Sequence, residues 1–266
     1  MRLDLFLVKN DSFATREKAK RAITSGGISV NGKAVFKPSY VVCEDDIVVV
    51  SAEAERYVGR GGYKLEGALD AFSFSVTDKT VADLGASTGG FTDCLLQNGA
   101  RKVYAVDVGQ NQLAERIKND PKVVVMEKTN ARTLSATSFD DEIQVVTADL
   151  SFISLRLVFP AISAILSRGG CAICLVKPQF EAGREWLGKN GIVRDKKAHR
   201  AVLMDLIANA AENHLIPFGL IPSPITGGDG NIEFLIGLRK NGEWCDLDVD
   251  AVVASAHYAL GKGGIK

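Results

Sequence analysis

The chain has 266 residues and a formal net charge of zero, which allows one large domain together with a small one. No segment is apolar enough to span a bilayer, and the stretch from Met1 to Lys9 is interrupted by Asp4, so neither a membrane protein nor a signal peptide is predicted. Five scattered cysteines are typical of a reducing cytoplasm. Cys171 and Cys174 share one apolar run and would point to opposite faces of a strand, so we expect core packing rather than a metal site.

The N-terminal residues carry most of the positive charge. Residues 1–37 contain eight Lys or Arg against three acids, a net +5 that leaves −5 for the remainder. The pattern predicts short helices at 2–8 and 15–24, a hairpin at 28–35 around Asn31-Gly32, and a third strand at 47–50. The division of charge into +5 and −5 favours an N-terminal domain that binds nucleic acid. A helix face that is charged only because it is solvated is the alternative.

Residues 51–62 are small, polar and glycine-rich, which is typical of a linker between domains. A helix then begins at Tyr63 and places Lys64 in its first turn. Strands and helices alternate from Thr80 onward, so a largely parallel sheet covered on both faces is predicted, with a hairpin at one edge. The expected strands are 80–83, 102–106, 122–126, 143–148, 171–176, 217–222 and 233–239, and the expected helices lie near 91–98, 111–118, 155–167, 196–213 and 247–260.

A glycine-rich turn between the first strand and helix is typical of an adenosine cofactor site. The apolar strand reaches Gly85, and the Gly89-Gly90 pair precedes the next helix. This spacing differs from that of dinucleotide binders, and no Gly-Lys-Ser/Thr follows it as in a phosphate-binding loop. Asp107 ends the next strand, where an acidic residue accepts hydrogen bonds from ribose hydroxyls. The predicted cofactor-binding residues are Asp83, Gly85, Ala86, Ser87, Thr88, Gly89, Gly90, Phe91, Asp107, Val108, Asn130, Ala131 and Asp149.

Charged residues also end the later strands, at the edge where such sheets bind ligands. Asp149 ends the fourth strand and Lys177 the fifth, while Glu233 starts the last strand at the same edge because the hairpin reverses direction. Charges at the ends of buried strands need partners or a chemical role. A structural salt bridge is the alternative explanation.

The N-terminal pattern resembles the ribosomal-protein-S-four-like RNA-binding domain. The similar stretches are Arg2-Leu-Asp, Thr15-Arg-Glu-Lys-Ala-Lys-Arg-Ala-Ile23 and Gly27-Ile-Ser-Val-Asn-Gly-Lys33. The resemblance implies salt-dependent contacts with RNA phosphates that read little sequence. The RNA-binding residues that it implies are Arg2, Arg16, Lys20 and Arg21.

The remainder resembles the methyltransferase half of the hemolysin/TlyA family. Similar stretches begin at Gly85, Asp107, Thr147, Val176 and Gly230, in the family's order. The resemblance implies a Rossmann-like, FtsJ-like class I methyltransferase of α/β fold with a mostly parallel seven-stranded sheet, behind a small α+β RNA-binding domain. It also implies S-adenosylmethionine as the cofactor and a ribose 2′-hydroxyl of ribosomal RNA, of cytidine type, as the acceptor. We expect an RNA-binding domain at 1–54, a linker at 55–62 and a methyltransferase domain at 63–266.

The family's Lys-Asp-Lys-Glu tetrad corresponds to Lys64, Asp149, Lys177 and Glu233. A ribose hydroxyl must lose its proton as it attacks, and an ordinary lysine is protonated at neutral pH. Desolvation and a second cation, Lys64, would favour a neutral Lys177, while the two acids oppose this and orient the side chain. Lys177 is therefore the predicted general base with Asp149 as its orienting partner, and Lys64 and Glu233 position the ribose. Arg56-Tyr57-Val58 stands where some members carry a tryptophan, which leaves coupling through the linker open.

Other activities fit the sequence less well. Asp149-Leu-Ser-Phe152 differs from the motif of amino-group methyltransferases, and no cysteine nucleophile for carbon methylation follows Asp149 or Lys177. Three histidines show no metal spacing. A membrane-active hemolysin lacks an apolar span, a nicotinamide oxidoreductase has the wrong glycine spacing, and a non-catalytic RNA-binding or ribosome-assembly factor would not need the tetrad. We therefore expect a cytoplasmic enzyme without a metal, acting on ribosomal RNA.

Overall fold

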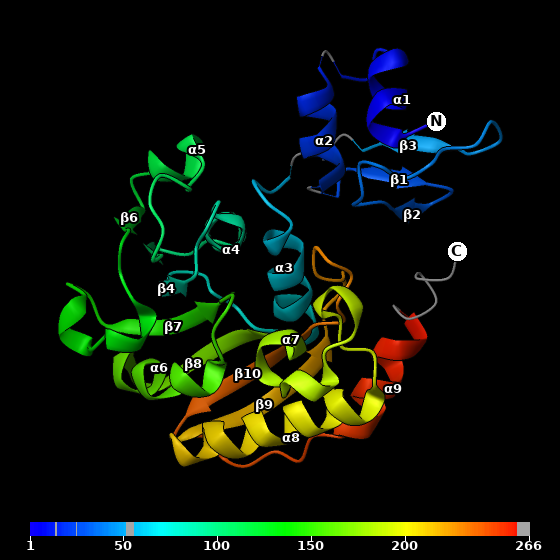
Figure 1. Cartoon of the computed structure of the whole chain (residues 1–266). Helices are drawn as coiled ribbons and strands as arrows, with labels where there is room; N and C mark the ends of the chain where they lie inside the picture. Colours follow the sequence, from blue (N-terminus) through cyan, green and yellow to red (C-terminus); the bar gives the residue numbers. More distant parts are fainter. Residues whose placement is uncertain (14, 25, 52–55, 260–266) are drawn as a thin grey trace.

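A computed structural model describes residues 1–13, 15–24, 26–51 and 56–259. The chain forms a small N-terminal body and a larger body built on a seven-stranded sheet (Figure 1). Helix α3 (Gly61–Ala71) begins the larger body and leads from the small one towards the sheet. None of the described helices is long and apolar enough to cross a bilayer.

The N-terminal body packs two helices against a three-stranded antiparallel sheet of order β2-β1-β3. Its elements are α1 (Leu3–Lys9), α2 (Arg16–Thr24), β1 (Ile28–Val30), β2 (Lys33–Ala34) and β3 (Val48–Val50). Leu3, Leu7 and Ile23 are fully buried in its core. The hairpin turn places Asn31 and Gly32 at φ 51° and 75°, a conformation that favours these two residue types. The predicted α+β arrangement is confirmed.

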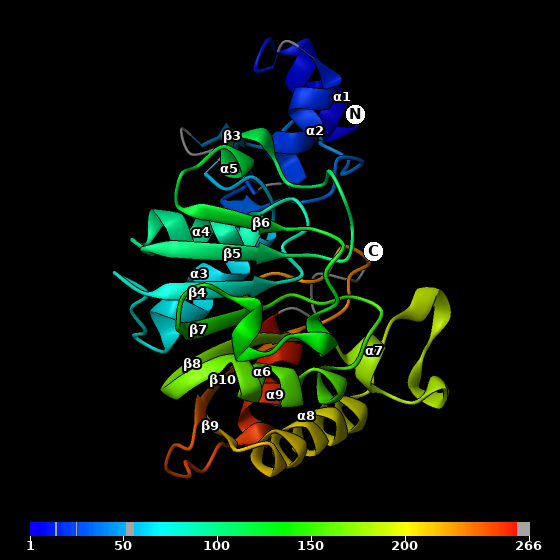
Figure 2. The ribbon, with the colours of Figure 1, turned by 90° about the vertical axis from the view of Figure 1, so that its left-hand side faces the viewer.

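The large sheet has the order β6-β5-β4-β7-β8-β10-β9 (Figure 2). The first five strands in this order, β6, β5, β4, β7 and β8, are parallel to one another. Strand β10 runs antiparallel to both of its neighbours, so the predicted edge hairpin is confirmed. Since β10 is reversed, the start of β10 lies beside the end of β8: Phe234 pairs with Val176. The strands are β4 (Thr80–Leu84), β5 (Lys102–Val106), β6 (Val123–Met126), β7 (Ile143–Ala148), β8 (Leu166–Val176), β9 (Leu215–Pro222) and β10 (Phe234–Lys240).

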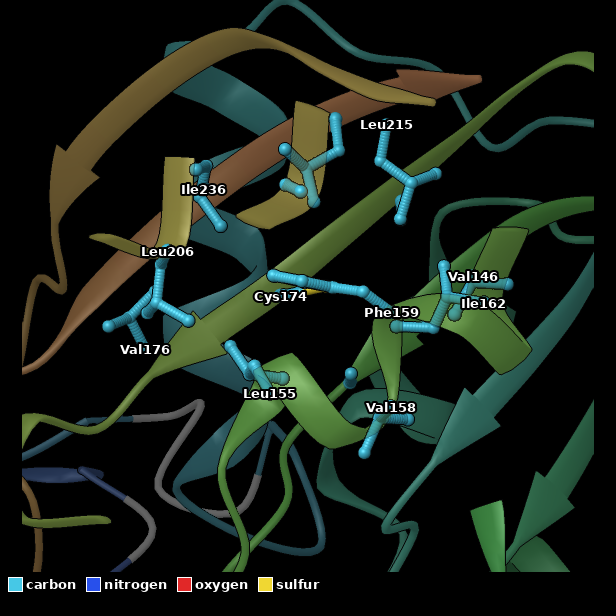
Figure 3. Close-up of a cluster of buried hydrophobic side chains, with 14 of the residues drawn as sticks. Val146, Leu155, Val158, Phe159, Ile162, Cys174, Val176, Leu206, Leu215 and Ile236 are labelled. Atoms are coloured by element: carbon cyan, nitrogen blue, oxygen red, sulfur yellow. The ribbon is translucent and has the colours of Figure 1, made fainter. Parts of the chain in front are cut away.

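Alternate strand residues bury the two faces of this sheet. Val81 and the residues level with it on neighbouring strands, such as Val103 and Val145, pack under α3 and α4. Ala82 and the residues level with it, such as Val146, pack under α6, α8 and α9. Figure 3 shows part of the second core, where Phe159 and Ile162 of α6 and Leu206 of α8 meet Val146, Cys174 and Ile236 of the strands. The remaining helices are α4 (Gly90–Gln97), α5 (Glu115–Lys118), α6 (Phe159–Ile165), α7 (Pro178–Glu181), α8 (Lys196–Glu212) and α9 (Val249–Ala259).

Two predicted helices are shorter in the structure. The helix expected at 155–167 is a 3₁₀ turn (Leu155–Leu157) followed by α6, and β8 takes over at Leu166. An irregularity in the β7–β8 register, with Gly169 at φ 74°, lets β8 begin five residues before the strand predicted at 171–176. The helix expected at 111–118 begins only at Glu115, because Asn111 adopts φ 55° and its N–H donates to Glu127 Oε1 at 2.7 Å.

Part of the predicted linker is packed rather than exposed. Residue 55 lies outside the described residues, but Tyr57 is 1% exposed and meets Tyr63 edge-on, with ring centroids 5.1 Å apart. The Val58 N–H donates to the buried Asp93 carboxylate at 2.7 Å. The small, polar residues of this segment suggested a linker, and they gave no indication that Tyr57 and Val58 would be anchored to the larger body.

Candidate active site

The glycine turn after β4 depends on backbone conformations that other residues avoid. Gly85 has φ 83°, and a Cβ there would lie 2.6 Å from the carbonyl oxygen of Asp149. Gly89 has φ 95° and is the N-cap of α4. The turn therefore brings bare backbone close to the end of β7. It also directs the N-terminus of α4 towards the carboxyl edge of the sheet.

Asp83 supports this turn from behind. Its carboxylate is fully buried and accepts hydrogen bonds from Thr92 Oγ1 at 2.6 Å and Thr147 Oγ1 at 2.8 Å. Burial raises the pKa of Asp83 to about 6, although both hydroxyls oppose the shift. Because both oxygens are engaged inside the protein, the structure gives Asp83 a supporting position and not the expected direct contact with a cofactor.

A cavity of about 330 Å³ lies along the ends of β4, β5 and β7. Asp107 lies on its wall, with its carboxylate oriented by the N–H groups of Ser87 at 2.8 Å and Gly109 at 2.7 Å. Asn130 caps a 3₁₀ turn by accepting from the Arg132 N–H, rather than lining the wall beside Ala131. The cavity is lined by Gly85, Ser87, Val106, Asp107, Val108, Gln112, Thr129, Ala131, Asp149, Leu150, Ser151 and Phe152.

A second cavity of about 150 Å³ adjoins the first, since Gly85, Ser87, Asp149 and Ser151 line both. It lies over the glycine turn and reaches Lys177. Its other lining residues are Gly61, Ala86, Thr88, Gly90 and Phe91. The turn and the charged pair at the ends of β7 and β8 thus border one continuous space.

Lys177 and Asp149 form an ion pair at this space. Lys177 Nζ lies 2.7 Å from Asp149 Oδ1, and it donates a hydrogen bond to Ser151 Oγ at 2.8 Å. Both charged side chains are mostly but not fully covered. The arrangement places one amine between a carboxylate and a hydroxyl, with access to the cavity.

Lys64 and Glu233 form a second, more deeply buried pair. The Lys64 ammonium donates to Glu233 Oε2 at 2.6 Å, and the two residues are 7% and 2% exposed. Among the described side chains, neither forms an ion pair with Lys177 or Asp149. The tetrad therefore consists of two separate pairs, and Glu233 rather than Lys177 is the immediate partner of Lys64.

Several lining residues were missed from the sequence. They are Gly61, Val106, Gln112, Thr129, Leu150, Ser151 and Phe152. Ser151 and Phe152 lie two and three residues after Asp149, so the strand-end rule that selected Asp149 could have found them. Phe152 is 90% exposed, adopts φ 64°, and its ring centroid lies 5.1 Å from that of Phe180. An exposed ring beside the ion pair offers a flat apolar surface to a ligand.

Of the predicted RNA-binding residues, Arg2 precedes α1, and Arg16, Lys20 and Arg21 belong to α2. Arg2 and Arg16 both contact the buried Asp4, at 3.0 Å and 2.9 Å. The Arg2 hydrogen bond is the main reason that the pKa of Asp4 is lowered to about 2. Lys20 is exposed, and the side chain of Arg21 lies outside the described part of the structure. Asp4 thus orients two of the predicted arginines at the surface.

The histidines lie away from the cavity. His199 of α8 and His257 of α9 approach within 2.9 Å through their ring nitrogens, and His214 follows α8. Burial lowers the pKa of His199 to about 4. No group of three or more His, Cys, Asp or Glu that could hold a metal ion occurs in the described residues.

Comparisons with known proteins agree with this geometry. Residues 57–240 match the FtsJ-like methyltransferase model and residues 1–48 the S4 domain. The chain is 52% identical to YqxC of Bacillus subtilis, named as a candidate rRNA methyltransferase, with 97% of this chain and 95% of that one covered. It is 38% identical to the 16S/23S rRNA (cytidine-2′-O)-methyltransferase TlyA of Mycobacterium tuberculosis, with 98% of each covered.

A solved structure gives the same result. A candidate hemolysin from Streptococcus thermophilus is 44% identical, with a TM-score of 0.78 over 99% of this chain and 98% of that chain. The match extends through both bodies of the fold, as do the matches to the curated relatives. The chain therefore belongs to the hemolysin/TlyA family, in which an S4 domain precedes an FtsJ-like methyltransferase domain.

Proposed function

We propose that this protein transfers a methyl group from S-adenosylmethionine to a ribose 2′-hydroxyl of ribosomal RNA. The observation that carries the proposal is the Lys177–Asp149 pair, which borders the same space as the glycine turn. A cofactor turn beside a lysine that is oriented by an acid suits the removal of a proton from a weakly acidic hydroxyl. The names of the relatives, rRNA methyltransferases in several cases, support this choice of substrate.

The residues of the larger cavity fit an adenosine cofactor. The Asp107 carboxylate keeps lone pairs for ribose hydroxyls beyond the two N–H groups that orient it. Val108, Ala131 and Leu150 supply apolar walls for a base. Gly85 and Gly90 leave room for close approach of the cofactor's methionine end to the backbone. When bound there, the cofactor supplies an electrophilic methyl group on a sulfonium.

Lys177 is the proposed general base. Lys177 Nζ would accept the hydroxyl proton while the ribose oxygen takes the methyl group that the bound cofactor would supply. Asp149 holds Nζ at the cavity and stabilises the ammonium that results. The buried Lys64–Glu233 pair is the proposed support for the ribose on the side of α3 and β10.

The exposed ring of Phe152 is the proposed contact surface for the RNA substrate. Unpaired bases in RNA stack on aromatic side chains, and this ring lies on the wall of the cavity while remaining 90% exposed. The S4 domain, with Arg2, Arg16, Lys20 and Arg21, would bind phosphates of the same RNA. We propose cytidine as the target nucleoside, because two relatives are named as cytidine methyltransferases. We also propose a cytoplasmic location. The proposed domain division is an RNA-binding domain at 1–54, a linker at 55–62 and a methyltransferase domain at 63–266.

Methyl transfer to isolated ribosomal subunits tests the proposal. Wild-type protein with labelled S-adenosylmethionine should methylate rRNA from subunits that lack the modification. Lys177→Ala should reduce the rate by at least about 100-fold, the lower range for general-base catalysis, while calorimetry shows cofactor binding near normal. Lys122→Ala is the matched control, because Lys122 is exposed just before β6, at the opposite edge of the sheet. Turnover retained in Lys177→Ala would refute the assignment of the base.

A further inference from the structure

Ser151 is a polar residue of the site to which neither the tetrad nor the cofactor turn assigns a role. Its Oγ accepts the hydrogen bond of Lys177 Nζ at 2.8 Å. It also lines both the cofactor cavity and the cavity over the glycine turn. Its hydroxyl is therefore in contact with the proposed base at the place where cofactor and acceptor would meet.

We propose that Ser151 is a positioning residue that fixes the Lys177 amine for proton abstraction. This inference rests on the proposed function and adds a fifth residue to the four of the tetrad. Ser151 acts through Lys177, since the proton passes from the ribose hydroxyl to Nζ and not to the serine. Its contribution is the direction of the nitrogen lone pair.

The two partners of Nζ hold it in different ways. Asp149 Oδ1 lies at 2.7 Å but lacks a well-aligned hydrogen bond, so the contact is chiefly a charge attraction. A base must be neutral before it accepts a proton, and neutral Lys177 loses most of that attraction. The hydrogen bond to Ser151 Oγ weakens but is kept when Nζ becomes neutral, because a neutral amine still carries two N–H donors. Ser151 thus holds the amine in the protonation state that reacts.

The geometry of an amine then gives the lone pair its direction. A neutral Nζ carries Cε, two hydrogens and one lone pair at the corners of a tetrahedron. When one hydrogen points to Ser151 Oγ and the other lies on the Asp149 side, the lone pair takes the remaining corner. A lysine side chain without this restraint samples many rotamers, and few of them direct the lone pair at the acceptor.

The backbone around Ser151 is itself fixed. The Asp149 N–H donates to the Leu84 carbonyl at 2.9 Å, next to the glycine turn. Phe152, directly after Ser151, adopts φ 64°, which bends the chain sharply at this point. Lys177 is followed by Pro178, the first residue of α7. Both ends of the Ser151–Lys177 hydrogen bond therefore start from well-defined backbone.

Steady-state kinetics of Ser151→Ala and Ser151→Thr test the inference. Ser151→Ala should lower kcat by about 10- to 100-fold, a part of what general-base catalysis contributes, and leave the KM values for S-adenosylmethionine and for ribosomal subunits unchanged. Ser151→Thr keeps the hydroxyl and should recover kcat to within a few-fold of wild type. Ser154→Ala is the matched control: this serine lies in the same segment, but its hydroxyl donates to Glu181 Oε2 at 2.6 Å. Its kcat should stay near that of wild type.

Three results would overturn the inference. An unchanged kcat in Ser151→Ala would show that the hydroxyl does not orient the base. A raised KM with normal kcat would show that Ser151 binds cofactor or RNA directly. A threonine variant that melts like wild type and is as slow as alanine would show that the hydroxyl is not the active feature. Failure of the proposed function is separate, because it would appear as no methyl transfer by the wild-type protein. Failure of the base assignment would appear as undiminished turnover in Lys177→Ala.

Discussion

At the scale of single residues, we propose that two ion pairs of the site have two different tasks. Lys177 and Asp149 border the cavity, where a proton can be exchanged with a ligand. Lys64 and Glu233 are almost fully enclosed, and Gly227 lies so close that a Cβ there would be 2.6 Å from Glu233 Oε1. Enclosure suits a fixed structural charge pair, whereas access to the cavity suits chemistry.

The buried pair should behave as one unit in stability measurements. Lys64→Met or Glu233→Gln alone leaves an uncompensated buried charge, so each should lower the free energy of unfolding by about 3–5 kcal/mol. The double variant should lose clearly less than the sum of the two. Urea unfolding of the four proteins gives the coupling energy directly. Strictly additive losses would contradict the description of Lys64 and Glu233 as partners.

Phe152 should affect substrate binding more than stability. Since the ring is 90% exposed, Phe152→Ala should change the melting temperature little. Loss of one base-stacking contact, worth about 1–3 kcal/mol, should weaken RNA recognition by about 5- to 150-fold, while Phe152→Trp keeps most of it. Methylation rates at limiting ribosomal subunits provide the measurement. Equal rates for Phe152→Ala and wild type would argue against a stacking role.

At the scale of elements, α8 and α9 are joined by a pair of histidines. His199 is fully buried, meets Phe234 at the start of β10 edge-on, and contacts His257 of α9. Phe234 directly follows Glu233, so this contact lies behind the buried ion pair. Two rings with nitrogens 2.9 Å apart cannot both be positively charged without repulsion.

Acid should therefore weaken this packing. Burial lowers the pKa of His199 to about 4, below the unfolded value of about 6.5. The unfolded chain binds the proton first, so the stabilisation is complete above pH 6.5 and is lost as the pH falls towards 4, by on the order of 3 kcal/mol. His199→Phe should lose less stability than wild type between pH 7 and pH 5 in urea unfolding. Parallel pH curves for the two proteins would refute this assignment.

Much of the architecture could be predicted from the sequence, because it depends on local patterns. The apolar runs of β5 and β7 and the edge hairpin predicted the sheet. The strand-end rule selected Gly85, Asp107, Asp149 and Lys177, which line the two adjoining cavities. Contacts between distant segments could not be predicted in this way. The burial of Tyr57 against α3 and the pairing of Lys64 with Glu233 depend on packing that no local pattern reports.

At the scale of the whole molecule, the S4 domain meets the methyltransferase domain beside the proposed active site. The Arg60 guanidinium lies 4.9 Å from the centre of the Phe36 ring of the N-terminal body and donates to the Thr226 carbonyl at 2.6 Å. Thr226 belongs to the loop that leads to Glu233. RNA held by the basic helices in Figure 1 would therefore be presented from the side of α3.

The contribution of the S4 domain should depend on salt. Lys20→Ala removes one expected phosphate contact, so the slope of log affinity against log salt for ribosomal subunits should fall by about one. Lys18→Ala is the matched control, because Lys18 is exposed on the same helix but lies about 200° away around its axis. Filter binding over a range of salt concentrations measures both slopes. Identical slopes for Lys20→Ala and wild type would remove Lys20 from the interface.

The central claim is transfer of a methyl group to a ribose of ribosomal RNA, with Lys177 as the base. Mapping of 2′-O-methyl groups in rRNA, with and without this protein, tests the claim most directly. We predict at least one site, at a cytidine, that appears with the wild-type protein and is absent with Lys177→Ala. A map that is identical with and without the protein, in every ribosomal particle, would contradict the account.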